Sequence, residues 1–205
     1  MRGRKKGIGE REKAKHGITN VVLSAQLNMP PDKRQLDLDE IAATLPNIEF
    51  EPDIFAGARL KLDGVSLIVF RTGAITITGA RSKSEADNVL DKLARLLRDN
   101  GLMFFEEEPF FRSEVTNIVA TASVGFPVSL EELSQKCEGV RYDPTEFPAA
   151  IFRRNNCTIL VFGTGKITIA GATSTEQIRE TKAAVIEEIE QYRIVEGSEL
   201  DEREM

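Results

Sequence analysis

The side chains that most often carry catalysis or bind metal ions are scarce in this chain. His16 is its one histidine, and Cys137 and Cys157 are its two cysteines. A zinc site needs about three or four His, Cys or carboxylate ligands, and the soft ligands here are too few and too scattered. A Ser–His or Cys–His catalytic pair would have to use His16, which lies in a highly charged terminal segment. No paired carboxylates, phosphate loop or activated nucleophile stand out, so we expect no enzymatic activity, no metal and no cofactor.

Phenylalanine, asparagine and threonine residues offer a different chemistry, that of a binding surface. Phe55 and Phe70 form one pair, and Phe147 and Phe162 form a second pair at corresponding places in an internal repeat. A solvent-facing strand would carry Lys, Glu, Arg and Gln, whereas a core-facing strand would not carry the Asn and Thr found around these pairs. An open sheet face with exposed Phe, Val and Leu indicates a binding surface unless another layer covers it. The alternative is that the four rings are ordinary core residues, and their pairing across the repeat favours the binding surface.

The repeat is the most informative feature of the body of the chain. Three blocks occur twice: residues 19–22 recur at 116–119, 50–55 at 142–147, and 70–82 at 162–174. In the last block, nine of thirteen aligned pairs are identical. The offset is 97 residues at the first block and 92 at the other two, so the first copy holds five extra residues, which we place in 28–34. Two copies at this spacing indicate a duplicated subdomain rather than a solenoid.

Each copy has the same predicted layout. An opening strand (20–25; 117–124) is followed by a short helix (38–45; 130–137), three or four short strands and a long amphipathic helix. Ser82-x-x-Glu85 and Ser174-x-x-Gln177 are typical of the capping boxes that begin helices. Apolar residues follow at helical spacing in both copies: Val89, Leu90, Leu93, Leu96 and Leu97, then Ile178, Val185 and Ile189. This order predicts an α+β fold whose helices cover one face of a mostly antiparallel sheet.

Alternation along the predicted strands divides their side chains between two faces. One face is aliphatic and suits burial under the closing helices: Leu67, Val69, Ile75, Ile77, Ile159, Val161, Ile167 and Ile169. The other face mixes small, hydroxyl and aromatic side chains: Ser66, Ile68, Phe70, Thr76, Thr78, Thr158, Leu160, Phe162, Thr168 and Ala170. Gly73 and Gly165, in F-x-T-G-x-I, are expected at hairpin turns.

Charge is unevenly distributed along the 205 residues. The formal net charge is −6, a sign that argues at first against a nucleic-acid partner. Residues 1–16 carry seven Lys or Arg against two Glu, and residues 196–205 carry five acids against one Arg. Such segments bury too little apolar surface to fold, so we expect a disordered basic arm (1–16) and a disordered acidic tail (196–205). Between them we expect a first repeat (17–112) and a second repeat (113–195). The sequence contains no run of about 18 apolar residues, so no membrane span is predicted.

Together, these blocks resemble the TATA-box-binding protein family over residues 17–195. The resemblance rests on the T-N-[VI]-V openings, the [ED]-P-x-x-F segments, the F-x-x-G turns and the I-T-I-x-G-A blocks, each present in both copies. It implies a saddle, that is, a curved antiparallel sheet with pseudo-two-fold symmetry and helices on its convex back. Members of the family bind the DNA minor groove and insert apolar wedges between base steps, which kinks the duplex.

The resemblance also implies roles for individual residues. Two wedges are implied, Phe55 with Phe70 and Phe147 with Phe162. Contacts to minor-groove edges are implied for Asn20, Val22, Ile68, Thr76, Thr78, Asn117, Val119, Leu160 and Thr168. Phosphate contacts at the rim are implied for Arg59, Lys61, Arg71, Arg153 and Lys166. A·T pairs present only acceptors in the minor groove, so short neutral donors suffice to read them.

The chain departs from the family pattern at several positions. Ala170 stands where the family has a hydroxyl partner of the central Asn, so we expect the second half to lose one hydrogen bond. Thr76 and Thr168 stand where the family usually has Val. The implied partners are A/T-rich double-stranded promoter DNA, a B-type general transcription factor at Asp143 and Glu146, and RNA polymerase. No membrane and no small-molecule substrate is expected.

Two matters stay open at the level of sequence. The location is expected to be the nucleus for a eukaryotic or viral member, and the cytoplasm or nucleoid for an archaeal one. The sheet could also serve as a protein-interaction module with weak or no DNA binding, which the acidic body and Ala170 favour. Salt-dependent binding to an A/T-rich duplex distinguishes a DNA-binding factor from such a module.

Overall fold

The computed structural model describes residues 16–29, 34–103 and 110–194. The predicted arm and tail therefore lie outside the described residues apart from His16, and so does most of the segment that holds the extra residues of the first copy. The first repeat contributes β1 (His16–Leu27), α1 (Leu38–Thr44), β2 (Ile48–Glu49), β3 (Gly57–Leu62), β4 (Val65–Phe70), β5 (Ala74–Ala80) and α2 (Lys83–Asp99). The second contributes β6 (Phe110–Ser123), α3 (Leu130–Lys136), β7 (Ala149–Arg154), β8 (Cys157–Phe162), β9 (Lys166–Ala172) and α4 (Thr175–Glu190).

The strands described form one antiparallel sheet in the order β2-β3-β4-β5-β1-β6-β9-β8-β7. The strands of the two repeats correspond as β1 to β6, β3 to β7, β4 to β8 and β5 to β9, and this order is the same from either end apart from the short β2. A pseudo-two-fold axis between β1 and β6 therefore relates the two repeats. These two opening strands are longer than predicted, and they pair with each other along most of their length. The two repeats therefore share one continuous sheet, and residues 112 and 113, the predicted repeat boundary, lie within β6.

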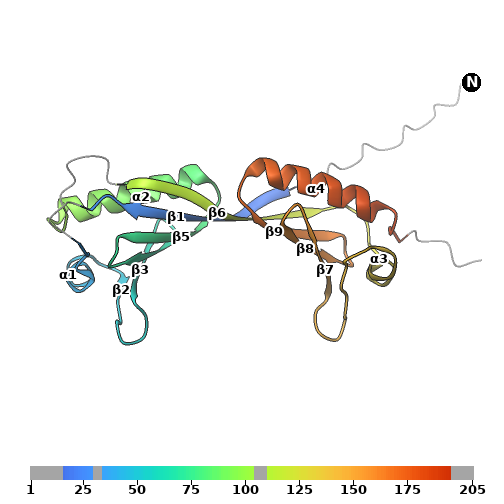
Figure 1. Cartoon of the computed structure of the whole chain (residues 1–205), viewed down its shortest axis with the longest axis horizontal. Coiled ribbons are helices and arrows are strands. Elements are labelled where there is room, and N and C mark those ends of the chain that lie inside the picture. Colours follow the sequence, from blue (N-terminus) through green and yellow to red (C-terminus); the bar gives the residue numbers. More distant parts are fainter. Residues whose placement is uncertain (1–15, 30–33, 104–109, 195–205) are drawn as a thin grey trace, which may run out of the picture.

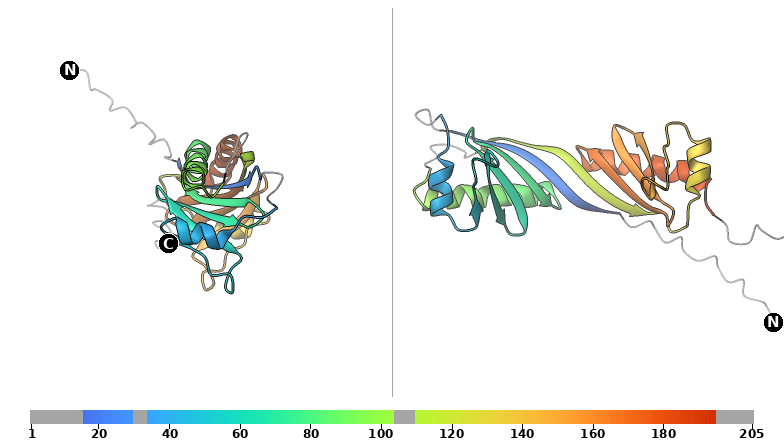
Figure 2. Two further views of the ribbon diagram at one scale, coloured as in Figure 1. Left: turned by 90° about the vertical axis from the view of Figure 1, so that its left-hand side faces the viewer. Right: turned by 90° about the horizontal axis from the view of Figure 1, so that it is seen from below.

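Helices α2 and α4 lie along one side of the sheet, while the segments that precede β3 and β7 project on the other side (Figure 1; Figure 2, left). The sheet is curved between its two ends, which carry α1 and α3 (Figure 1). This arrangement confirms the α+β saddle expected from the sequence.

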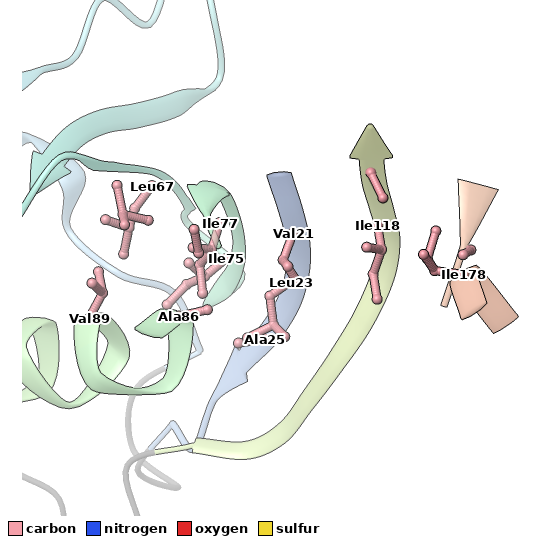
Figure 3. Close-up of a cluster of buried hydrophobic side chains, with 14 of the residues drawn as sticks. Val21, Leu23, Ala25, Leu67, Ile75, Ile77, Ala86, Val89, Ile118 and Ile178 are labelled. Carbon is pink, nitrogen blue, oxygen red and sulfur yellow. The ribbon is translucent and has the colours of Figure 1, made fainter. Parts of the chain in front are cut away.

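The core lies between the sheet and the two long helices. Figure 3 shows strand side chains of the first repeat facing Ala86 and Val89 of α2. The predicted aliphatic face is buried: Leu67, Val69, Ile75, Ile77, Ile159, Val161, Ile167 and Ile169 are each at most 4% exposed. The helical stripes are buried as predicted, with Leu96 partly so. Burial of this apolar surface is the main force that holds the helices on the sheet.

Both predicted N-caps, Ser82 and Ser174, form, and the reciprocal bond of each box comes from the residue before the N-cap. The Ser82 hydroxyl accepts a hydrogen bond from the Glu85 amide at 3.1 Å, and the Glu85 carboxylate accepts from the Arg81 amide at 2.7 Å. Ser174 and Gln177 make the equivalent pair of contacts at the start of α4. These bonds satisfy backbone donors that would otherwise be unpaired at the helix N-terminus. In the segments described, no helix combines the length and apolar character needed to cross a membrane.

Candidate nucleic-acid interface

We call the sheet surface that faces away from α2 and α4 the concave face. Alternation and strand register place on it Asn20, Val22, Ser24, Arg59, Lys61, Ser66, Ile68, Phe70, Thr76, Thr78, Glu114, Asn117, Val119, Thr121, Arg153, Thr158, Leu160, Phe162, Lys166, Thr168 and Ala170. Every residue to which the sequence assigned a minor-groove contact lies on this face. Helices α2 and α4 lie on the opposite side of the sheet, and α1 and α3 lie at its two ends (Figure 1).

The two predicted central asparagines lie on the neighbouring strands β1 and β6, where the repeats join. Asn20 pairs with Val119 across the β1–β6 interface, and Asn117 pairs with Val22. Each asparagine directly follows a threonine that forms a β-bulge, that is, an extra residue in its strand. The hydroxyl of this threonine donates a hydrogen bond to a backbone carbonyl of the facing strand. Thr19 donates to the carbonyl of Val119 at 3.2 Å and Thr116 to that of Val22 at 3.3 Å. Bulges of this kind redirect the side chains that follow them.

Each asparagine side chain is oriented by a glycine. The Asn20 Oδ1 atom accepts from the amide of Gly79 at 2.7 Å, and the Asn117 Oδ1 atom accepts from the amide of Gly171 at 2.8 Å. Because a backbone N–H can only donate, the oxygen is the amide atom that must face it. The Nδ2 group of each asparagine, which donates to no residue in the described chain, is therefore the end available to a ligand.

The hydroxyl neighbours of these asparagines differ between the repeats. The Thr78 hydroxyl lies 3.4 Å from the Asn20 Oδ1 atom, whereas Ala170 at the equivalent place in the second repeat has no hydroxyl. The hydroxyl contact to the asparagine is therefore present in the first repeat and lacks its counterpart at Ala170 in the second. Thr76 and Thr168 lie one register step further along, opposite Ile68 and Leu160, and all four side chains are partly exposed.

The phenylalanines form two ring pairs near the two ends of the concave face. The ring centroids of Phe55 and Phe70 are 6.0 Å apart, and those of Phe147 and Phe162 are 6.4 Å apart. Phe147 is 41% exposed, which is unusual for so large an apolar side chain. The rings are therefore partly open to solvent, as the binding-surface interpretation requires.

The first ring pair is more enclosed than the second. The guanidinium of Arg59 lies 4.5 Å from the centroid of Phe55. A Cβ atom at Gly57 would approach Phe55 Cε1 to 2.8 Å and Phe70 Cε1 to 3.1 Å, so glycine is what lets both rings lie over the β3 backbone. The second repeat has Ala149 at the equivalent position.

Four of the five predicted phosphate-binding cations are exposed on the concave face or its rim: Arg59, Lys61, Arg153 and Lys166. Arg71 differs because it lies in the turn after β4. Its guanidinium pairs with Asp39 of α1 at 2.7 Å and lies 5.3 Å from the ring of Phe50. The structure therefore engages Arg71 with the helix at the end of the sheet rather than leaving it as a free cation at the rim.

The predicted partner-binding carboxylates, Asp143 and Glu146, lie in the turn before β7 and are both engaged inside it. Asp143 accepts from the side chain and amide of Thr145, at 2.6 and 2.9 Å, and these bonds hold the pKa of its carboxyl below the usual value. Glu146 pairs with Arg141 at 2.5 Å. In the equivalent turn of the first repeat the counterpart of Glu146 is Ile54, which is 74% exposed.

The structure adds residues that the sequence did not single out. Gly79 and Gly171 were not recognised as the groups that orient the asparagines, although each follows the I-T-I-x block directly. Glu114 lies outside the predicted strand (117–124), whereas β6 begins at Phe110 and the bulge at Thr116 shifts its alternation by one residue. A bulge of this kind leaves no period-2 signal from which to infer the face.

A polar cluster ties β7 to α4 on the helix side of the second repeat. Arg154 donates from Nε to Glu188 at 2.9 Å and from its terminal nitrogen to the other carboxylate oxygen. Burial opposes ionisation of Glu188, but the bonds from Arg154 and Cys137 outweigh it, so the pKa of Glu188 is lowered. Burial, helped by Glu188, raises the pKa of the Cys137 thiol to about 11. The described residues contain no group of three side chains suited to hold a metal ion.

A family model, curated relatives and a solved structure all match this chain to TATA-box-binding proteins. The family model described as transcription factor TFIID (or TATA-binding protein, TBP) matches residues 15–100 and 112–192. The chain is 33% identical over 180 residues to a TATA-box-binding protein of Methanocaldococcus jannaschii, which covers 86% of this chain and 94% of that one. It is 35% identical over 166 residues to one of Pyrobaculum calidifontis, with coverages of 78% and 79%. A solved structure, Methanococcus jannaschii TBP, superposes with a TM-score of 0.76 at 32% identity and covers 86% of this chain and 99% of that one.

Proposed function

Since the chain belongs to the TATA-box-binding protein family, we propose that it is a general transcription initiation factor that binds and bends A/T-rich promoter DNA through the minor groove. The observation that carries this proposal is the orientation of Asn20 and Asn117. Their amide oxygens are held by Gly79 and Gly171, so that the donor ends are left for a ligand. A proposed role of this kind involves no enzymatic step.

The proposed contact at the centre is a match of donors to acceptors. A·T and T·A pairs both present only adenine N3 and thymine O2 in the minor groove, and both atoms are acceptors. The two asparagine Nδ2 groups lie close to the pseudo-two-fold axis, where each can donate to one such acceptor. The match is the same for an A·T and a T·A base pair, because both present acceptors. Val22 and Val119, the register partners of the two asparagines, add apolar surface that disfavours the guanine amino group.

The ring pairs supply the proposed bending. Partly exposed rings at the two ends of a curved sheet suit insertion between base steps, which partly unstacks them. The unstacking costs a few kcal/mol per step and is lowest at flexible steps such as TA. Sequence preference is thus expected to come from deformability as well as from the central donors.

The acidic balance of the chain does not oppose this proposal, because the acids lie mainly elsewhere. Helices α2 and α4 carry nine Asp and Glu residues on the opposite side of the sheet. Among the described strand side chains, the concave face carries Arg59, Lys61, Arg153 and Lys166 against two acids, Glu49 and Glu114. Long-range repulsion from the acidic body falls off within a Debye length of about 10 Å at 0.1 M salt.

Recruitment of a B-type initiation factor and RNA polymerase is the second part of the proposal. It rests on the family and on the exposed turns before β3 and β7, which project to the same side as the concave face (Figure 1). Asp143 and Glu146 remain the proposed contacts, presented in the geometry that Thr145 and Arg141 impose. The named relatives come from archaea, which favours the nucleoid as the proposed location.

The proposal is tested by measuring affinity and bend angle together on a library of A/T-rich duplexes, with the full chain and at several salt concentrations. Salt-dependent binding to a subset of duplexes, with bending of those duplexes, is the expected result. No binding at about 0.1 M salt would overturn the proposal in favour of a protein-interaction module. A binding assay between the DNA-bound protein and a B-type factor, with Glu51 and Asp53 of the first turn as matched control sites, tests the second part.

A further inference from the structure

Several charged side chains of the concave face lack a like counterpart in the other repeat: Arg59 corresponds to Ile151, Lys166 to Ala74, and Glu114 to Gly17. Among these three, Glu114 is the carboxylate. In the first repeat a row of register partners runs from Thr76 on β5 to Ser24 on β1 and Glu114 on β6. In the second repeat the equivalent row runs from Thr168 on β9 to Thr121 on β6 and Gly17 on β1. A carboxylate in one half therefore corresponds to a bare backbone position in the other.

The position of Glu114 is fixed by its neighbours along β6. Val115 packs against the core, and the Ser113 hydroxyl donates to Asp87 of α2 at 2.9 Å, so both side chains point to the helix side. Glu114 lies between them and is the register partner of the exposed Ser24, which places it on the concave face. It is exposed and forms no ion pair with any residue that the structure describes.

A carboxylate at this place is a poor match for A·T pairs. It can only accept hydrogen bonds, and the minor-groove edges of A·T and T·A pairs offer only acceptors. The one donor on the minor-groove edges of the four base pairs is the exocyclic N2 amino group of guanine. A hydrogen bond from that group to a carboxylate is charge-assisted and stronger than a neutral one.

We propose that Glu114 is a specificity-determining residue that makes the first half of the concave face prefer a G·C pair where the second half, with Gly17, prefers A·T. The protein is then oriented on any A/T-rich site that has a G·C pair at one end. This inference rests on the proposed minor-groove function, and it adds a base preference and a direction that pseudo-two-fold symmetry alone does not supply.

The duplication provides reciprocal variants. Glu114→Gln keeps the shape of the side chain and removes its charge. Gly17→Glu introduces the carboxylate into the other half, where a Cβ atom would meet no heavy atom within 4 Å and the backbone φ is not positive. Circular dichroism and thermal unfolding of each variant check that the fold is unchanged.

The experiment measures the affinity of the full-length protein and both variants for duplexes in which each base pair of an A/T-rich site is changed in turn to G·C or to inosine·C. Inosine lacks the N2 amino group, so an inosine·C pair resembles A·T in the minor groove. For the wild type, we expect one end of the site to prefer G·C over inosine·C by about tenfold or more, the scale of one hydrogen bond to a charged group. Glu114→Gln is expected to lose that preference, and Gly17→Glu to gain it at the mirror-related position.

Three results would overturn the inference: equal affinity for G·C and inosine·C at every position, a uniform change for Glu114→Gln across all duplexes, or no new preference with Gly17→Glu. A uniform gain would mean that the carboxylate only repels phosphates. Failure of the wild type to bind any duplex would overturn the proposed function itself and this inference with it, so the two failures are distinguishable.

Discussion

The Oδ1 atom of Asn20 accepts a hydrogen bond from the backbone amide of Gly79 at 2.7 Å, and this contact determines which end of the side-chain amide faces outward. Asn117 and Gly171 repeat it at 2.8 Å. Both glycines have a positive φ, 94° and 101°, a conformation that turns the strand so that its amide reaches the neighbouring side chain. In each repeat, a glycine amide thus holds the oxygen of a distant asparagine so that the Nδ2 donor of that asparagine faces outward.

Replacing either asparagine by aspartate tests this arrangement. Asn20→Asp or Asn117→Asp keeps the oxygen that Gly79 or Gly171 requires but exchanges the outward donor for an acceptor. We expect each variant to weaken binding to A/T-rich DNA by about tenfold or more, at unchanged thermal stability. Asn88→Asp on the exposed side of α2 is the control for the change in charge. Equal effects of the three substitutions in a fluorescence anisotropy titration would contradict the role of the donor.

The two wedge pairs are tested by their effect on bend angle. Phe162→Ala removes a ring proposed to insert between base steps, whereas Lys166→Ala removes a rim cation four residues away. We expect the first variant to lower the bend angle measured by energy transfer between end-labelled duplexes, and the second to lower affinity with little change in angle. If none of Phe55→Ala, Phe70→Ala, Phe147→Ala and Phe162→Ala reduces bending, the wedge assignment is wrong.

The rim cations are tested by the salt dependence of binding. Each phosphate contact that is removed lowers the slope of log affinity against log salt concentration by about 0.9. We expect this decrease for Arg153→Gln and for Lys166→Gln, whose side chains are exposed on the concave side. Arg71→Gln is the matched control and should leave the slope unchanged, because the structure pairs Arg71 with Asp39. A full decrease with Arg71→Gln would show that this pair opens on DNA.

The Arg154–Glu188 pair predicts a pH dependence of stability. The pKa of Glu188 is lower in the folded protein than in the unfolded chain, so its contribution is complete above the unfolded value of about 4.3 and is lost as the pH falls through the folded value. Glu188→Gln should lower the free energy of unfolding by about 1–3 kcal/mol at pH 7, and the difference from wild type should shrink toward pH 3. Urea unfolding at several pH values measures this, with the exposed Glu187→Gln as control. A difference that stays constant with pH would exclude the pair as its source.

The fold could be predicted from the sequence because its signals are local and occur twice. Alternation in 66–70 and 158–162, the capping serines Ser82 and Ser174, and the turn glycines each indicate one element, and the duplication confirms each by a second copy. Gly73 and Gly165 do occupy the predicted hairpin turns with positive φ. The turns between β3 and β4 and between β7 and β8 were not identified, although Asp63-Gly64 and Asn155-Asn156 are typical of type I′ hairpins.

The binding face was harder to predict because it depends on contacts between distant strands. The sequence identifies Asn20 and Asn117 as polar residues in a strand but not which end of the amide is free, which Gly79 and Gly171 decide. Nothing local to Arg71 indicates that Asp39 of α1 lies beside it. The face on which Glu114 lies depends on one bulged residue, and a bulge is visible only once the register of β1 and β6 is known.

The covalent joining of the two halves has an evolutionary consequence. In a dimer of identical single repeats, every substitution appears twice, so both ends of the binding face would have to change together. Because β1 and β6 belong to one polypeptide, each half can accumulate substitutions on its own while the shared sheet maintains their alignment. The differences between Thr78 and Ala170, Ile54 and Glu146, and Gly17 and Glu114 are such substitutions. Because the two halves are joined in one chain, the two ends of a pseudo-symmetric binding face can come to differ from each other.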